Sequence, residues 1–208
     1  MTEKKKAAGW RLQDGLLMAM LGLLFGLVYL GIFYLGLALQ TALTPAGLGP
    51  FAFEIVYGIW FLGATLAAYI MQKPGVAFVT EVIAALLELL MGNSGGVMVV
   101  ITGVIQGLGA EAGFALFGYK RWDVVSLLAS GITAALFTML QTVYIGGYSA
   151  LSPGIIAATV IVRIISAVLF ASLAALGLGR GLAKTGVLKS YPLGRQFAPT
   201  LDAAEDEL

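Results

Sequence analysis

The chain has 208 residues, of which 60% are hydrophobic and 11% charged, and its formal net charge is +1. A soluble domain carries about 25% charged residues, so this composition indicates an integral membrane protein, and its near-zero net charge does not favour a nucleic-acid partner. The sequence contains no Cys and no His, which excludes disulfides, thiol nucleophiles, histidine acid–base catalysis and zinc sites built from these residues.

Six apolar segments predict membrane-spanning helices, because about 20 residues are needed to cross the hydrocarbon core. In chain order we expect them at residues 16–39, 51–71, 75–91, 97–117, 124–145 and 154–176. The turn-forming stretches TPAGLGP, QKPG, GNSGG, YKRWD and GGYSALSPG separate them. The sequence therefore predicts an all-α, six-helix membrane bundle over residues 15–183. It also predicts a cytoplasmic N-terminal segment at 1–14 and a mobile cytoplasmic tail at 184–208.

The basic residues predict the orientation of this bundle. Every Lys and Arg except Arg163 lies before the first span, between the second and third, between the fourth and fifth, or after the sixth. Loops rich in Lys and Arg stay in the cytoplasm, so we expect both termini there, in a protein of the plasma membrane that contacts lipid. An even number of spans requires the same arrangement.

Seven charged or amide residues lie inside the predicted spans. A carboxylate near the bilayer centre costs at least about 2.5 kcal/mol, so such residues usually face the bundle interior or a cavity and pair with one another. By position along its span, Arg163 is expected near the midplane, where it can pair with Glu81 or Glu111 as a structural lock. The seven residues are Glu54, Glu81, Glu88, Gln106, Glu111, Gln141 and Arg163.

Glu54 and Glu88 lie about one helical turn, roughly 5 Å, below the outer ends of their spans, where the sequence places no basic residue. Either they reach the lipid headgroups or they point into an outward pocket. Tyr57 shares a helical face with Glu54, and Trp60 lies at the edge of that face. A carboxylate beside aromatic rings suits an organic cation or an aminopyrimidine. The alternative for the two aromatic residues is ordinary packing against lipid.

Other residues carry open alternatives. Glu81 and Glu88 are seven residues apart, so they lie on one stripe of a helix, and Asn93 follows in the outer loop. Gln106 can bind a ligand or make a simple interhelical hydrogen bond. In the first span, small residues recur at helical spacing, which allows close approach either of a partner or of another helix of this chain; they are Gly15, Ala19, Gly22 and Gly26.

Two long stretches carry a family resemblance. They are GPFAFEIVYGIWFLGATLAAYIMQKPGVAFVTEVIAALLELLMGN at 49–93 and VIQGLGAEAGFALFGYKRWD at 104–123. They resemble the YkoE family, the substrate-binding S-components of energy-coupling-factor (ECF) transporters. The resemblance extends over residues 10–181 and fades in the C-terminal tail.

The resemblance implies a six-helix bundle that binds thiamin or its hydroxymethylpyrimidine precursor near the outer face. It implies no enzyme activity, metal or cofactor of its own, because a transmembrane coupling protein with two cytoplasmic ATPase subunits uses the ATP. Docking on that coupling protein would use the small residues of the first helix. By depth and facing within the matched stretches, we expect the ligand-binding residues to be Glu54, Tyr57, Trp60, Glu81, Glu88, Asn93 and Gln106.

Two other functions compete with this hypothesis. A stand-alone proton-coupled carrier or channel would use intramembrane carboxylates such as Glu81 and Glu111 to move protons. An intramembrane hydrolase is disfavoured because the sequence has no His. The sequence also has no G-x-x-x-x-G-K-[ST] phosphate-binding loop, so any use of ATP is expected to come from another subunit.

Overall fold

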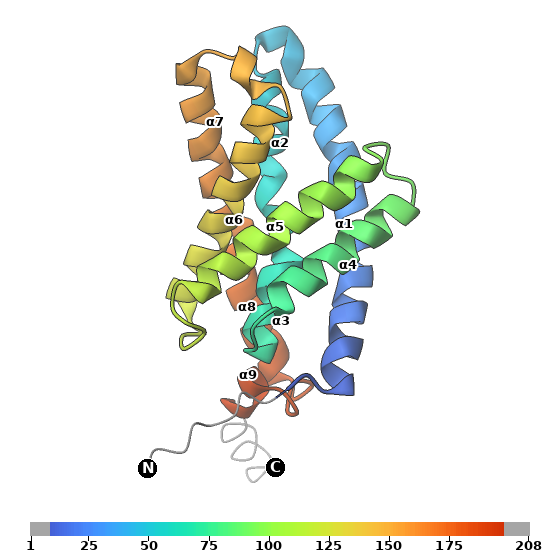
Figure 1. The fold of residues 1–208 in the computed structure, drawn as a ribbon, viewed down its shortest axis with the longest axis vertical. Coiled ribbons are helices and arrows are strands. Elements are labelled where there is room, and N and C mark those ends of the chain that lie inside the picture. The colour runs from blue at the N-terminus through green and yellow to red at the C-terminus, as the bar shows by residue number, and fades with distance from the viewer. Residues whose placement is uncertain (1–8, 198–208) are drawn as a thin grey trace.

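The computed structural model describes residues 9–197, and these form an elongated bundle of helices without strands (Figure 1). In chain order the α-helices are α1 (Leu12–Leu43), α2 (Ala52–Val56), α3 (Leu62–Met71), α4 (Val76–Leu90), α5 (Val97–Ala115), α6 (Val124–Tyr144), α7 (Pro153–Ser166), α8 (Ala174–Lys184) and α9 (Pro192–Arg195). Short 3-10 helices lie at η1 (Thr44–Ala46), η2 (Gly49–Phe51), η3 (Tyr57–Phe61) and η4 (Tyr148–Ala150), and a π-helical segment lies at η5 (Ala167–Leu173).

Five helical stretches in the described residues are long and apolar enough to cross a membrane. They coincide with five of the expected spans, which confirms an all-α membrane protein. The third expected span is α4, which has only 15 residues and is therefore about 22 Å long. It lies beside α5, and both cross the long axis of the molecule obliquely (Figure 1). Because α4 is shorter than the other spans, the count of six full membrane crossings stays a prediction.

Two of the expected spans are not continuous α-helices. The second is broken by η3 between α2 and α3. The last one runs from α7 through the π-helical segment η5 into α8, and it continues to Lys184 rather than ending at residue 176. The two irregular segments contact each other in the middle of the bundle. Short 3-10 or π-helical segments inside a longer helix are frequent at functional sites, and η3 contributes to the candidate site described below.

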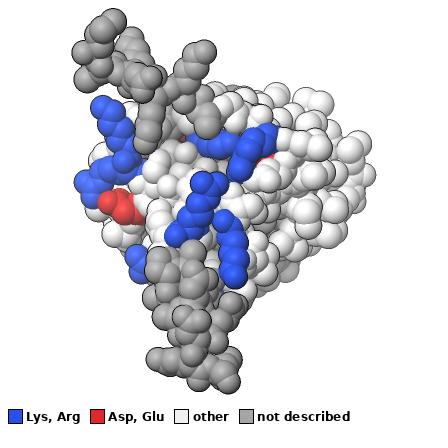
Figure 2. All heavy atoms as spheres, turned by 90° about the horizontal axis from the view of Figure 1, so that it is seen from below, with Lys and Arg blue, Asp and Glu red and all other residues white. Residues whose placement is uncertain are grey.

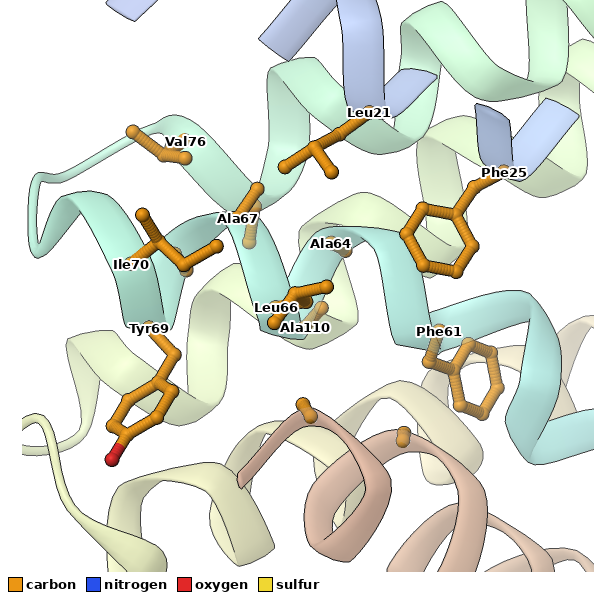
Figure 3. Packing of buried hydrophobic residues seen from close by; sticks show 14 of the residues in the cluster. Leu21, Phe25, Phe61, Ala64, Leu66, Ala67, Tyr69, Ile70, Val76 and Ala110 are labelled. Carbon is orange, nitrogen blue, oxygen red and sulfur yellow. The ribbon is translucent and has the colours of Figure 1, made fainter. Parts of the chain in front are cut away.

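The core is built around α3, in which every residue from Gly63 to Met71 is buried. Small residues on this helix let its neighbours approach closely, and larger apolar side chains fill the space between the helices. Figure 3 shows Ala64, Ala67 and Ile70 of α3 packed with residues of α1, α4 and α5, namely Leu21, Phe25, Val76 and Ala110. The centre of the bundle is therefore tightly packed, and it separates the two ends of the molecule.

The two ends of the described chain meet at one end of the bundle. The Tyr191 hydroxyl donates a hydrogen bond to the Gln13 carbonyl (2.8 Å), and Arg11 donates to the Ser190 carbonyl. Blue Lys and Arg side chains are spread across this end in Figure 2. The helix order places all described Lys and Arg residues at this end except Arg163, as the sequence predicted.

Residues 185–197 differ from the mobile tail that the sequence suggested. They turn back against the bundle through α9, which packs on α3 and α8. Leu188 and Leu193 are buried there because the apolar sequence after Lys184 provides a small hydrophobic face. The remaining residues of the predicted tail, 198–208, and the first eight residues of the predicted N-terminal segment lie outside the described residues.

Candidate ligand-binding site

A cavity of about 220 Å³ lies among α1, α2, η3, α4 and α5. The loop between α4 and α5 forms part of its wall. Since α4 begins beside Lys73 at the basic end, that loop lies toward the opposite end of the bundle. The cavity is lined by Phe33, Phe53, Tyr57, Trp60, Glu88, Asn93, Gly95, Met98, Val99, Thr102 and Gln106.

Four aromatic rings form one wall of the cavity. The ring centroids of Phe33 and Phe53 are 6.2 Å apart, those of Phe53 and Trp60 are 6.2 Å apart, and those of Tyr57 and Trp60 are 5.6 Å apart. The rings therefore form a chain of contacts from α1 through α2 to η3. Such a wall offers flat apolar surface and π-faces, which bind planar rings and organic cations.

Glu88 supplies a carboxylate to this aromatic site. Its side chain is 3% exposed, and the Asn93 amide donates a 2.6 Å hydrogen bond to its Oε1 atom. The Asn93 Oδ1 atom in turn accepts from the Gly95 backbone N–H at 2.7 Å, so the loop orients the amide. The Trp60 indole also interacts with Glu88. Within the described residues no Lys or Arg forms an ion pair with this carboxylate.

Gln106 is the polar cavity residue with free hydrogen-bonding groups. It is 4% exposed, and its amide makes no hydrogen bond to any residue in the range 9–197. Thr102, one turn earlier on α5, already accepts a 2.7 Å hydrogen bond from the Gln141 amide. Because Gln106 lines the cavity, its amide is available to donate and accept hydrogen bonds with a bound polar ligand.

Five of the seven expected ligand residues come together here: Tyr57, Trp60, Glu88, Asn93 and Gln106 all line the cavity. Glu54 and Glu81 do not. Sequence reasoning missed six of the lining residues. Phe33, Phe53, Met98 and Val99 are ordinary apolar residues of membrane helices, and Gly95 and Thr102 are small, so no sequence signal distinguishes them. The six are Phe33, Phe53, Gly95, Met98, Val99 and Thr102.

Glu54 lies instead in a buried ion pair with Arg163. The guanidinium donates from Nε to Glu54 Oε2 (2.5 Å) and from Nη2 to Oε1 (2.7 Å), and both side chains are almost completely buried. The expectation that Arg163 pairs with Glu81 or Glu111 is therefore wrong. Depth along the helix was misleading because a long arginine side chain on a helix leans toward the N-terminus, which for α7 is the end away from the basic end of the bundle.

Glu81 is fully buried below the cavity. Its Oε2 atom accepts a 3.1 Å hydrogen bond from the Tyr29 hydroxyl, which itself accepts from the Gly63 backbone N–H. The other carboxylate oxygen has no partner in the described residues. Glu81 therefore braces α1 against α3 and α4 rather than lining the cavity.

Glu111 holds the start of α4 in place. Its two carboxylate oxygens accept hydrogen bonds from the backbone N–H groups of Gly75 (2.6 Å) and Phe78 (3.2 Å). A carboxylate at the N-terminus of a helix satisfies donors that have no partner within the helix and interacts favourably with the helix dipole. This structural role explains an acidic residue that sequence analysis could only assign to a lock or a proton path.

The expected docking stripe on α1 is divided between two environments. Gly22 and Gly26 are buried against α4, where a Cβ atom on Gly22 would lie 2.4 Å from Ile83 Cγ2. These two residues pack inside the chain, which was the alternative interpretation of the stripe. Gly15 and Ala19 are exposed, and a Cβ atom on Gly15 would contact nothing.

Comparison with known proteins agrees with this architecture. The family model "ABC-type cobalt transport system, permease component" matches residues 13–137. The protein YkoE of Bacillus subtilis (strain 168), named as a candidate HMP/thiamine permease, is 38% identical over 189 residues, or 90% of this chain and 92% of that protein. A solved structure described as an S-component of an ECF transporter covers 96% of this chain and 99% of its own, with 35% identity and a TM-score of 0.88.

The chain belongs to the YkoE family of ECF-transporter S-components. It is a multi-pass membrane protein and a transport subunit, and the resemblance seen in the sequence is confirmed. Within this S-component, the cavity described above is the candidate ligand site.

Proposed function

We propose that this S-component binds thiamin or hydroxymethylpyrimidine in the cavity beside Glu88 and delivers it for ATP-driven import. The observation that carries the proposal is the buried carboxylate of Glu88, which has no cationic partner among residues 9–197 and shares the cavity with an aromatic wall and the Gln106 amide. The name of the YkoE relative, which mentions HMP and thiamine, supports the same ligand class.

The chemistry of the cavity fits such ligands. Thiamin carries a positive thiazolium ring and an aminopyrimidine, and hydroxymethylpyrimidine keeps the aminopyrimidine alone. Glu88 can accept hydrogen bonds from the exocyclic amine or balance the thiazolium charge, whereas Tyr57 and Trp60 can stack on the rings. Asn93 and Gln106 can recognise ring nitrogens or the hydroxyl group.

A metal ion is a poorer match for these residues, although the description of the matching family model names cobalt. Cobalt and similar ions bind through several imidazole, thiolate or carboxylate ligands. The cavity lining contains one carboxylate, two amides and four aromatic rings. This donor set favours an organic ligand.

For the orientation, we propose that the basic end of the bundle faces the cytoplasm. The spread of Lys and Arg over this end supports that arrangement through the positive-inside rule. Both termini would then be cytoplasmic, the cavity would lie toward the outside of the plasma membrane, and residues 15–183 would form the substrate-binding domain.

For the partners, we propose a transmembrane coupling protein that carries two cytoplasmic ATPase subunits. The sequence has no phosphate-binding loop of its own, which supports ATP use by another chain. Gly15 and Ala19 are the members of the expected docking stripe that remain exposed, so they are the part that a partner helix can contact. The protein would need no cofactor of its own.

The test is a ligand titration of the purified chain, followed by its intrinsic tryptophan fluorescence. We expect thiamin or hydroxymethylpyrimidine to quench the fluorescence with saturable binding, because Trp60 lines the cavity, and we expect cobalt to have no saturable effect. If neither organic ligand binds, the proposed function is wrong.

The stand-alone carrier needs a separate experiment. This alternative is supported by Glu81, a buried carboxylate with one oxygen unpaired in the described residues. The purified chain in liposomes with a pH gradient, without other subunits, should not accumulate labelled thiamin. Uptake driven by the pH gradient alone would favour the carrier.

A further inference from the structure

The segment η3 departs from the membrane helix around it and carries two of the four cavity rings. A 3-10 helix has three residues per turn, so residues three apart lie directly above one another. Tyr57 and Trp60 are three apart, and in η3 both therefore face the cavity. In a continuous α-helix their directions would differ by about 60°. The 3-10 geometry thus aligns the two rings.

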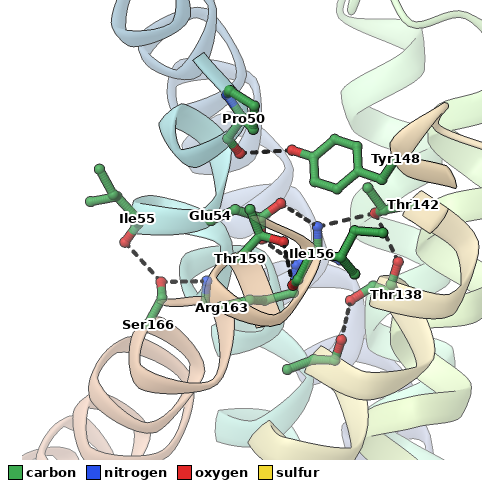
Figure 4. A network of polar contacts seen from close by, with 12 residues as sticks. Pro50, Glu54, Ile55, Thr138, Thr142, Tyr148, Ile156, Thr159, Arg163 and Ser166 are labelled. Carbon is green, nitrogen blue, oxygen red and sulfur yellow. Dashed lines mark hydrogen bonds and ion pairs between the residues drawn. The ribbon is translucent and has the colours of Figure 1, made fainter. Parts of the chain in front are cut away.

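The break in the helix changes its backbone hydrogen bonds. The Tyr57 N–H donates to the Glu54 carbonyl, which in an α-helix would accept from the Gly58 N–H. Gly58 N–H donates instead to the hydroxyl of Ser166 on α7 (2.9 Å), and that hydroxyl donates to the Ile55 carbonyl (2.8 Å). One serine hydroxyl therefore satisfies a donor and an acceptor at the break, as Figure 4 shows for Ile55 and Ser166.

The contact between η3 and the end of α7 is unusually close at this point. A Cβ atom on Gly58 would lie 2.1 Å from the Ser166 carbonyl oxygen, so no larger residue fits without moving a backbone. The close approach brings α7 and the start of η5 directly against η3, on the side away from the cavity.

Arg163 lies one turn before Ser166 on α7 and contacts the same segment. Its guanidinium pairs with Glu54, donates a 3.0 Å hydrogen bond from Nη2 to the Thr142 hydroxyl oxygen, and lies 3.8 Å from the centroid of the Tyr57 ring. Figure 4 shows this network around Glu54 and Thr142. A planar guanidinium stacks well on an aromatic ring, so Arg163 fixes the orientation of Tyr57.

We propose that Ser166 and Arg163 are positioning residues for the ligand cavity: they hold η3 in its 3-10 form so that Tyr57 and Trp60 present their rings to the ligand. Neither residue lines the cavity, so both act through η3. The proposal rests on the proposed function for its ligand, but the geometry of η3 can be tested without one.

The test compares Ser166→Ala with Ser172→Ala. Both serines are buried, and each variant removes one hydroxyl group. The Ser172 hydroxyl donates to the Leu127 carbonyl of α6 at 2.8 Å and has a long 3.5 Å contact with the Ala167 carbonyl, and among the described residues it makes no hydrogen bond to η3. In fluorescence titrations with thiamin and hydroxymethylpyrimidine, we expect Ser166→Ala to weaken binding by roughly fivefold or more, and Ser172→Ala to leave it unchanged. Equal affinities in the two variants would overturn the proposal.

A double-mutant experiment with Tyr57 distinguishes the positioning role of Ser166 from a purely structural one. If Ser166 acts through the aligned rings, its effect on affinity should largely disappear in a Tyr57→Leu background, whereas the effects of independent sites add. A loss that stays the same size in that background would show that Ser166 does not act through the ring. Arg163→Lys keeps the charge but loses the planar contact with Tyr57, so it should weaken binding while the chain remains folded.

A spectroscopic readout keeps the test independent of the ligand. The chain has three tryptophans, so Trp10→Phe with Trp122→Phe leaves Trp60 alone. In this background, without ligand, Ser166→Ala should shift the Trp60 emission and Ser172→Ala should not. If the parent chain binds neither compound, the proposed function fails, and the Trp60 spectrum alone decides the positioning role. Identical spectra in the two variants would contradict it.

Discussion

Glu54 and Glu88 have similar places in the sequence but opposite surroundings in the structure. Each lies about one turn from the outer end of its expected span, and each is buried. Glu54 is neutralised by a bidentate pair with Arg163, whereas the polar partners of Glu88 within the described part of the chain are the Asn93 amide and the Trp60 indole. Depth and residue type therefore do not distinguish a structural carboxylate from a ligand-binding one, whereas the charge of the neighbouring side chains does.

The largest expected effect comes from breaking the Glu54 pair. Glu54→Gln leaves the guanidinium of Arg163 buried without its counter-charge, which should cost about 3–5 kcal/mol of unfolding free energy. Thermal unfolding in detergent measures the loss, with Glu88→Gln as the matched control. Replacing both partners by Leu should recover most of the stability but not the ligand affinity, because Arg163 no longer holds Tyr57. If Glu54→Gln were as stable as the parent chain, the structural role of the Glu54–Arg163 pair would be wrong.

Glu88→Gln should have the opposite effect, with lower ligand affinity and no loss of stability. The side chain keeps its shape and loses the charge that a cationic ligand needs, so thiamin affinity should fall about tenfold to a hundredfold. The unfolding temperature should stay equal to or above that of the parent, because a desolvated charge has been removed. Fluorescence titration and thermal unfolding of the same sample test both statements. A destabilised variant with normal affinity would assign Glu88 to the same structural class as Glu54.

The glycines of α1 offer a second contrast between a buried and an accessible position. Gly22→Leu should destabilise the fold by about 1–3 kcal/mol, because its side chain would overlap Ile83. Gly15→Leu meets open space and should leave both stability and ligand binding unchanged, while it impairs assembly with the coupling protein. Co-purification with that protein and thermal unfolding distinguish the two variants. Normal assembly of Gly15→Leu would count against this part of α1 as the contact.

The smallest effect is expected for Gln106. Gln106→Leu removes an amide that has no partner in the described protein, so stability should not fall, and affinity should drop by roughly fivefold through loss of a ligand hydrogen bond. Ser130→Ala is a suitable control because its buried hydroxyl donates to the Ala110 carbonyl and does not line the cavity. If Gln106→Leu binds both ligands as tightly as the control does, the amide does not read the ligand.

Several features of the fold could be predicted from the sequence because they depend on local patterns. Apolar length predicted the main spans, and the basic loops predicted that the ends of the described chain share one end of the bundle. The break at η3 could not be predicted, because it depends on Ser166, more than a hundred residues away, which replaces backbone partners. For α4, the sequence indicated only that the expected span was slightly shorter than the length needed to cross the membrane.

Part of the candidate site could be predicted because polar residues are rare in membrane helices and are therefore easy to recognise in the sequence. Glu88, Asn93 and Gln106 stood out because each is costly to bury. Glu54 and Glu81 stood out for the same reason, but neither lines the cavity described above. Burial cost alone did not reveal their partners, which are Arg163 and Tyr29. The Phe33 and Phe53 rings were hidden among the apolar residues that every membrane helix needs.

The most direct test of the central claim compares two ligands on two proteins. Thiamin carries a fixed positive charge and hydroxymethylpyrimidine is neutral, so an unpaired Glu88 should favour thiamin. Titration of the parent chain and of Glu88→Gln with both compounds should show a larger loss for thiamin than for hydroxymethylpyrimidine. Equal losses, or no loss for either compound, would contradict the account of Glu88 as a carboxylate that receives its cation from the ligand.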